Sequence, residues 1–155
     1  MNVSTLDSPL GPVWVTVNAD GEVVQVGFGH PAEPALPSSA SDAAADQLRE
    51  YFAHERTAFD LPLAPRGTAF QQRVWAALAE IPYGYTDSYG RIAARIGHPK
   101  ASRAVGLANR NNPIAIVVPC HRVVGASGTL VGYAGGLERK RWLLALEGVG
   151  APTLV

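Results

Sequence analysis

The chain has 155 residues, of which 47% are apolar and 17% charged, and its formal net charge is zero. This size suits a globular protein with one core or two small ones. No apolar run approaches the roughly 18 residues that cross a bilayer, so we expect no membrane span, and the start lacks the basic-then-apolar pattern of a secretory signal. A single cysteine excludes an internal disulfide and a four-cysteine zinc site, and it favours a reducing cytoplasm.

Charge is distributed unevenly along the chain. Residues 1–66 carry three arginines against nine acidic residues, a net charge of −6, whereas residues 67–155 carry ten basic against four acidic residues, a net charge of +6. The second part could therefore approach phosphates, which the first part would repel. Composition leaves open the plainer alternative that the two halves simply attract each other.

The first part of the chain predicts a small sheet followed by a helix. Valines alternate over 13–17, turn-forming residues follow at 18–21, and a second apolar run covers 23–28. This pattern predicts a β-hairpin.

Two proline-bearing stretches frame the helix that follows. The stretch 30–41 predicts a surface loop, and Ser41 or Asp42 is expected to cap a helix with apolar residues at helical spacing. The second stretch, 61–67, is the expected domain boundary.

The second part of the chain begins with a helix start signal. Thr68 followed by Gln71 fits a capping box, and the apolar face that follows ends at Pro82. A last helix is predicted over 137–146, ending near Glu147.

Two short helices between these predict a helix-turn-helix. Asp87 or Ser88 can cap the first helix, which Gly97 closes. Pro99 is expected near the first turn of the second helix, over 100–110.

The second of these helices is built from small residues, with Arg103 and Arg110 near its ends. Small residues favour close packing inside a core. The flanking cations favour the other interpretation, a slim helix that enters a groove lined by phosphates.

One segment brings reactive side chains together. An apolar run over 114–118 leads to Pro119, then Cys120, His121 and Arg122. A thiol reacts as its thiolate, so it needs neighbours that ionise it or accept its proton, and both following residues are of that kind. A lone cysteine is also compatible with an inert core residue, and adjacent residues of an extended chain would point apart.

A longer series of residues matches a known family. In chain order they are Ile81, Pro82, Gly84, Ser88, Tyr89, Pro99, Ala101, Arg103, Ala104, Val105, Gly106, Asn112, Pro113, Val118, Pro119, Cys120, His121, Arg122, Val123, Gly132, Tyr133, Gly135, Gly136, Leu137, Lys140, Leu143, Leu144 and Glu147. At these spacings, residues 67–150 resemble the O6-alkylguanine-DNA alkyltransferases, also called methylated-DNA-protein-cysteine methyltransferases. The Ser-Pro-Leu-Gly phrase at 8–11 also resembles the start of such proteins.

The resemblance implies an α+β fold. A small N-terminal α/β domain, ribonuclease-H-like, would span 1–66, and a C-terminal helical domain with a winged helix-turn-helix-like motif would span 67–155. It also implies direct-reversal DNA repair, in which a methyl or alkyl group passes irreversibly from O6-alkylguanine to the protein after the base is flipped through the minor groove. Acceptance of O4-alkylthymine is left open.

The resemblance assigns roles to five residues. Cys120 would accept the alkyl group, and His121 would take its proton through a bridging water. Glu147 would hold the imidazole, Tyr89 would donate a proton to the departing O6 oxygen, and Asn112 would brace the active-site turn.

The resemblance further implies two binding surfaces. The DNA-binding residues would be Ser102, Arg103, Ala104, Gly106 and Arg110, with Arg103 filling the gap left by the flipped base. The substrate pocket would comprise Val123, Tyr133, Ala134, Gly135, Gly136 and Lys140. Ala134 stands where some relatives carry serine, so a hydroxyl that could contact the base is absent.

The expected partner is alkylated double-stranded DNA, bound by a monomer, with cooperative binding left open. We expect no cofactor and no membrane contact. We also expect no metal, because His30 and His54 stand apart and form no zinc ligand set.

Plainer roles compete at three of the residues. Tyr89 could pack on Phe70, and His121 could satisfy a backbone carbonyl. Glu147 could be a simple end-of-helix residue, although an acidic side chain is unfavourable there, which indicates a partner.

Three other function classes compete with this interpretation. A non-catalytic lesion-binding protein would lack the Cys120 thiol. A cysteine hydrolase would bring its histidine from a distant segment and need an oxyanion site. A transcriptional helix-turn-helix protein would leave the segment 119–122 unexplained.

Overall fold

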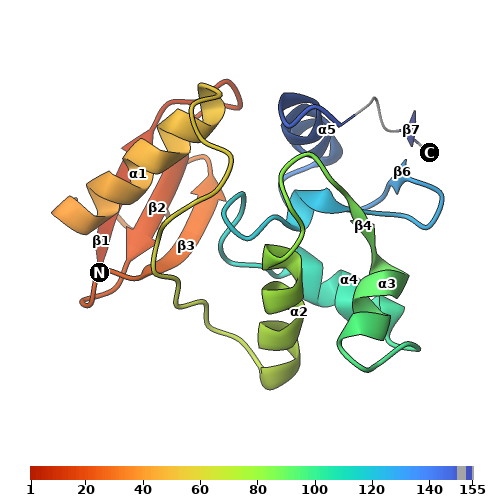
Figure 1. The fold of residues 1–155 in the computed structure, drawn as a ribbon. Helices are drawn as coiled ribbons and strands as arrows, with labels where there is room; N and C mark the ends of the chain where they lie inside the picture. The colour runs from red at the N-terminus through yellow and green to blue at the C-terminus, as the bar shows by residue number, and fades with distance from the viewer. Residues whose placement is uncertain (150–152, 155) are drawn as a thin grey trace. The chain divides into compact units, whose positions relative to one another are not determined.

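The computed structural model describes residues 1–149 and 153–154. The chain forms two compact units, one of Met1–Arg66 with Pro113–Val117 and the other of Gly67–Asn112 with the residues from Val118 onward (Figure 1). The expected division after residue 66 had placed 113–117 in the second unit. In the structure this segment bonds to a strand of the first unit, through Val26 N–H to Pro113 O and Ala115 N–H to Val26 O. An edge strand with unpaired backbone groups accounts for this pairing.

The first unit is a three-stranded antiparallel sheet with one helix against it (Figure 1). Its elements are β1 (Asn2–Leu6), β2 (Val13–Val17), β3 (Val23–Phe28) and α1 (Ser39–Phe52). The predicted hairpin is confirmed as β2 and β3, while β1 was not predicted, because serine and threonine interrupt its apolar pattern. The valines of β2 pack with Ala44, Ala45 and Leu48 of α1 to form the core between sheet and helix.

Helix α1 begins earlier than expected. Its N-cap is Ser38, whose hydroxyl accepts the Ser41 N–H at 3.1 Å, while the Ser41 hydroxyl accepts the Ser38 N–H at 2.8 Å. The expected caps, Ser41 and Asp42, therefore lie inside the first turn. Ser41 is also fully buried, and its hydroxyl lies 2.7 Å from that of Ser4 on β1, which ties the helix start to the sheet.

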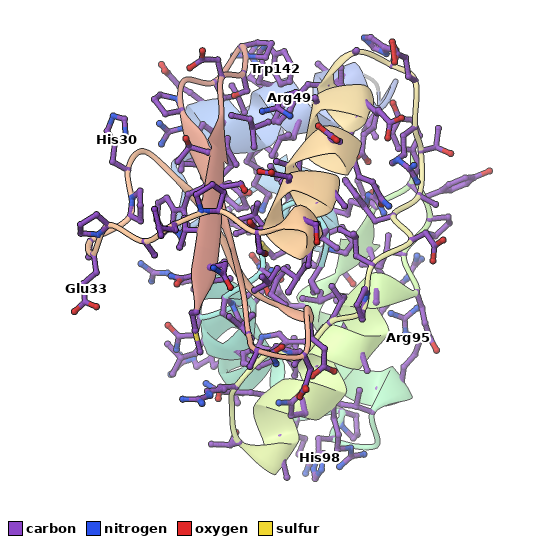
Figure 2. The ribbon with its side chains drawn as sticks, turned by 90° about the vertical axis from the view of Figure 1, so that its left-hand side faces the viewer. His30, Glu33, Arg49, Arg95, His98 and Trp142 are labelled. Carbon is purple, nitrogen blue, oxygen red and sulfur yellow. The ribbon has the colours of Figure 1, made fainter. Side chains whose placement is uncertain are left out.

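The loop before α1 carries exposed polar side chains. His30 and Glu33 point away from the unit (Figure 2). The surface-loop prediction for this proline-rich stretch is confirmed up to residue 38.

The second unit is helical with short strands. Its elements are α2 (Ala69–Ala79), β4 (Asp87–Ser88), α3 (Tyr89–Arg95), α4 (Ser102–Arg110), the 3-10 helix η1 (Cys120–Arg122), β5 (Val123–Val124), β6 (Thr129–Leu130), α5 (Leu137–Leu146) and β7 (Thr153–Leu154). The capping box of Thr68 and Gln71 on α2 is confirmed, as are the bounds of α5. Strands β4 and β5 pair in parallel. Because α3 directly follows β4 and η1 directly precedes β5, this pairing brings the start of α3 close to η1.

The helix-turn-helix is formed by α3 and α4. Ser88 caps α3, and Gly97 follows its end with φ +83°, as predicted. Helix α4 begins two residues later than expected, so Pro99 lies outside it. Pro99 instead occupies the second position of a turn closed by Ala101 N–H to His98 O at 2.9 Å, where its fixed φ is favourable. His98 lies at the outer end of this turn (Figure 2).

The capping box of α1 gives a test of the fold. We expect Ser38→Ala to lower the free energy of unfolding by about 1 kcal/mol, because the Ser41 N–H loses its hydroxyl acceptor at the helix start. Ser39→Ala is the matched control, since Ser39 is exposed at the first helical position. Urea unfolding of both variants measures the difference, and equal stability of the two would contradict the assignment of the cap.

Candidate active site

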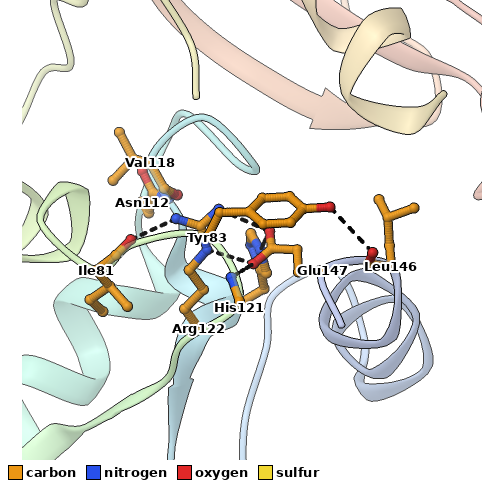
Figure 3. A network of polar contacts seen from close by, with 9 residues as sticks. Ile81, Tyr83, Asn112, Val118, His121, Arg122, Leu146 and Glu147 are labelled. Carbon is orange, nitrogen blue, oxygen red and sulfur yellow. Dashed lines mark hydrogen bonds and ion pairs between the residues drawn. The ribbon is translucent and has the colours of Figure 1, made fainter. Parts of the chain in front are cut away.

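The cysteine lies on a tight turn and not on an extended strand. Within the preceding apolar run, Ile116 adopts a left-handed φ of +71°, and the chain then enters η1 with Cys120 only 5% exposed. The Cys120 N–H donates to Val118 O at 2.8 Å, and the Asn112 amide donates to the same carbonyl at 2.8 Å. Asn112 thus lies where a brace for this turn was expected (Figure 3).

A buried carboxylate joins the two residues that follow the cysteine. Glu147 Oε2 lies 2.7 Å from His121 Nε2 (Figure 3). Arg122 donates to both Glu147 oxygens, through Nε at 2.7 Å and Nη2 at 2.9 Å, and its Nη1 donates to Ile81 O at 2.6 Å. All three ionisable residues are buried and at most 6% exposed. The partner that the sequence indicated for Glu147 is therefore a pair of side chains.

Tyr83 covers this ion pair. Its ring centroid lies 5.8 Å from Arg122 Cζ, and its hydroxyl donates to Leu146 O at 3.3 Å (Figure 3). Burial, followed by the Glu147 charge, raises the pKa of Tyr83. The sequence did not indicate Tyr83, and it indicated Arg122 only as a cation next to the thiol and not as the partner of Glu147. The tyrosine carried no motif, and the arginine's partner lies 25 residues away along the chain.

The contact with Glu147 sets the protonation of His121. A carboxylate accepts hydrogen bonds, so the imidazole proton is assigned to Nε2. Nδ1 has no hydrogen-bond partner among residues 1–149 and 153–154, which leaves it a bare acceptor. Burial lowers the pKa of His121, although Glu147 opposes the shift. The neutral ring can therefore accept a proton.

The thiol itself is protonated at rest. Burial raises the pKa of Cys120, and the hydrogen bond from Asn112, the Lys140 charge and the hydrogen bond from Tyr133 oppose this only in part. Neighbours that ionise the sulfur were one sequence-level expectation, and for the resting protein it is wrong. The sulfur therefore needs a group that removes its proton during reaction.

Two side chains hold the loop that follows β6. The Tyr89 hydroxyl donates to Val131 O at 3.0 Å, and Lys140 Nζ donates to Val131 O at 2.9 Å and Gly132 O at 3.0 Å. Burial lowers the pKa of Lys140 to about 8, while Cys120 opposes the shift. Burial raises the pKa of Tyr89, and the charge of Cys120 adds to this. The Cys120 charge thus affects the pKa of both Tyr89 and Lys140, and the Lys140 charge in turn favours the thiolate.

The other residues expected in the substrate pocket differ in how far they are exposed. Tyr133 is buried with its hydroxyl toward Cys120, and burial raises its pKa well above the ordinary value. Ala134 and Gly136 are exposed, and Gly135 O accepts a hydrogen bond from Arg139 at 3.1 Å. Val123 is fully buried in β5, so it offers no accessible surface to a substrate in this structure.

The expected DNA-binding residues share one helix. Ser102, Arg103, Ala104 and Arg110 are exposed on α4, and Gly106 is half-buried. Leu107, which sequence reasoning did not select, is 60% exposed on the same helix. The core-packing interpretation of the small residues therefore holds fully for Ala108, which is 2% exposed, and only in part for Ala101 and Gly106, which are half-buried.

Two of the plainer roles can also be assessed. Phe70 packs edge-on against His98, with ring centroids 5.9 Å apart, while Tyr89 reaches the loop after β6. His121 bonds a carboxylate and not a backbone carbonyl. Among the described residues, no cluster of three histidine, cysteine or acidic side chains could hold a metal ion, and no described helix is long and apolar enough to cross a membrane.

Comparisons with known proteins cover both units. Residues 69–149 match the family model described as 6-O-methylguanine DNA methyltransferase, DNA binding domain, and residues 1–65 match its ribonuclease-like domain. A methylated-DNA--protein-cysteine methyltransferase of Mycobacterium bovis is 55% identical, covering 96% of this chain and 93% of that protein. One of Methanosarcina acetivorans is 50% identical, covering 96% and 99%.

A solved structure has the same fold. The crystal structure of Mycobacterium tuberculosis OGT in complex with DNA aligns with a TM-score of 0.88 and 52% identity, covering 98% of this chain and 96% of that one. The resemblance seen in the sequence is thus confirmed, and the chain belongs to the 6-O-methylguanine DNA methyltransferase family.

Proposed function

We propose that this protein repairs DNA by direct reversal, taking the alkyl group of an O6-alkylguanine onto Cys120. The observation that carries the proposal is the buried arrangement of Cys120, His121 and Glu147 on one turn and one helix end, in a chain of this family. Each protein molecule reacts once, because the thioether that forms on Cys120 is a stable product that water does not cleave.

The chemistry follows from the protonation of the site. The sulfur attacks the alkyl carbon, and the S–C bond forms as the bond from carbon to O6 breaks. The thiol proton passes to Nδ1 of His121, through a bridging water as the family resemblance implies, and Glu147 stabilises the charged imidazole. Tyr89 supplies a proton to the departing purine, for which its hydroxyl must leave Val131 O. One proton leaves the thiol and one reaches the purine, and the step is completed when the charged His121 releases its proton to water and the Tyr89 phenolate takes one up from water.

The DNA is proposed to bind the exposed side of α4 in the minor groove. The small exposed residues Ser102 and Ala104 permit close approach, and the half-buried Gly106 adds no bulk beside Tyr89. Arg103 is exposed and free to enter the stack in place of the flipped base, and Arg110 suits a phosphate contact. We propose that one protein molecule suffices for repair.

The two units are proposed to differ in role. The second unit carries Cys120 and α4 and a positive charge, so it holds the chemistry and the DNA contacts, while the acidic first unit supports it. A cytoplasmic location is part of the proposal, because the acceptor must remain a reduced thiol.

Intact mass spectrometry tests the proposed acceptor. After incubation with a duplex that contains O6-methylguanine, the protein should gain one methyl group, which peptide mapping should locate on Cys120. Cys120→Ala should gain none and leave the DNA methylated, and an unmodified duplex is the control. Methyl loss from DNA with Cys120→Ala would show that another group is the acceptor.

Arg103→Ala tests the role of the exposed arginine. Transfer from duplex DNA should slow by about tenfold or more, because the gap left by the flipped base costs a few kcal/mol when unfilled. Transfer from free O6-benzylguanine should change little. Arg141→Ala removes the same charge from an exposed position of α5 and should leave both rates near those of the wild type. Equal slowing of duplex and free-base reactions by Arg103→Ala would refute the role.

The raised pKa of Cys120 predicts a pH dependence. Since the folded pKa lies above the ordinary 9.0, the thiolate fraction is small at neutral pH and rises as pH increases through and beyond that value. Alkylation by iodoacetamide in native protein should therefore be slower at pH 7.5 than in urea-unfolded protein, and should still increase above pH 9. The single cysteine makes the signal specific. A native rate that levels off near pH 7 would contradict the assignment.

A further inference from the structure

Asn109 is a buried polar residue that the proposed mechanism does not use. It lies on the inner side of α4 and is 1% exposed. Its Nδ2 donates to the carbonyl oxygen of Cys120 at 3.3 Å, and that carbonyl also accepts the Val123 N–H. Its Oδ1 has no hydrogen-bond partner among residues 1–149 and 153–154. Half of this amide is therefore unsatisfied within the part of the chain that the structure describes.

An unpaired buried oxygen is unfavourable, so packing alone does not favour asparagine here. Leucine has a similar size and would fill the same place without a polar atom. What asparagine adds is the donor to Cys120 O. A residue that conflicts with the ordinary preference for apolar burial is most readily explained by a role in a site.

The end of α4 holds the cysteine turn through two amides. Asn112 donates to Val118 O at 2.8 Å, and Asn109 donates to Cys120 O, so the two carbonyls on either side of Pro119 are both fixed. The backbone N–H of Asn112 donates to the backbone carbonyl of Asn109 at 3.3 Å, which links the two residues through the main chain.

The helix end is itself anchored. The indole N–H of Trp75, on α2, donates to Ala108 O at 2.8 Å, and both groups are buried. A side chain one residue further along α4 is therefore held on a rigid support. The same helix carries Arg103 on its exposed side.

We infer that Asn109 is a positioning residue, which fixes the Cys120 turn relative to α4 and so sets the direction of the sulfur toward the base that the DNA-bound helix presents. The inference rests on the proposed function. Loss of the Asn109 donor removes no reacting group but lets the turn that carries Cys120 and His121 shift, and a misplacement of about 1 Å can slow a reaction about a hundredfold.

Asn109→Leu tests the inference, with Asn109→Ala as a second variant in case leucine does not fit. Single-turnover transfer from an O6-methylguanine duplex should slow by about tenfold or more. The dissociation constant for an unmodified duplex should be unchanged, and thermal stability should not fall for leucine, because the unpaired oxygen is gone. A purely structural asparagine would instead affect stability and leave the transfer rate constant unaltered.

Ser4→Ala is the control. It removes a buried side-chain hydrogen bond to Ser41 in the first unit, away from α4 and the cysteine turn, so it should lower the melting temperature with little effect on transfer at a temperature where it is folded. Wild-type transfer by Asn109→Leu, or equal slowing by Ser4→Ala, would overturn the inference. Failure of the wild-type protein to accept a methyl group would overturn the proposed function itself, which separates the two failures.

Discussion

The buried charge of Glu147 constrains most of the second unit. A carboxylate removed from water is stable only when it is closely paired and hydrogen-bonded. Here Arg122 supplies two charge-assisted hydrogen bonds and His121 a third. Because Arg122 also bonds Ile81 O, one carboxylate ties η1, the end of α5 and the segment after α2 together. Truncation of Glu147 or of Arg122 would leave the charge of the other unpaired in the interior.

Because of this pairing, Arg122 and His121 have different charges beside the same carboxylate. Arg122 balances the charge of Glu147, so His121 can stay neutral despite its carboxylate neighbour, and burial favours the same state. The neutral imidazole donates from Nε2 and keeps Nδ1 as an acceptor. Burial also keeps Cys120 protonated at rest. If the proposed function holds, each acceptor thiol reacts only once. Its protonated resting state then slows reaction with other electrophiles until a substrate is bound.

Local signals predicted much of the fold. The capping residues Thr68 and Ser88, the glycine at 97 and the limits of the last helix were read from short patterns, because caps and helix ends depend on neighbouring residues. Contacts between distant residues were not predictable in this way. The apolar run before Cys120 resembles a core strand, yet it turns at Ile116 and pairs with β3, since that edge offers free backbone groups.

The candidate active site shows the same difference between residues that a motif identifies and contacts that join distant parts of the chain. The family resemblance named Cys120, His121 and Glu147, and the structure brings the last two together at 2.7 Å. The part played by Arg122 and the link from Asn109 to Cys120 join residues 25 and 11 positions apart, and no local pattern reports such pairs. The protonation of the thiol depends on burial, which a sequence motif does not encode.

The protonation of His121 is the most direct measure of this account. Nitrogen-15 NMR of the folded protein at pH 7, with the His121 signals among those of the four histidines identified by comparison with His121→Gln, reports which ring nitrogens carry a proton. The account predicts a neutral ring with its proton on Nε2 and a bare Nδ1. A doubly protonated ring, or a neutral ring with its proton on Nδ1, would contradict it.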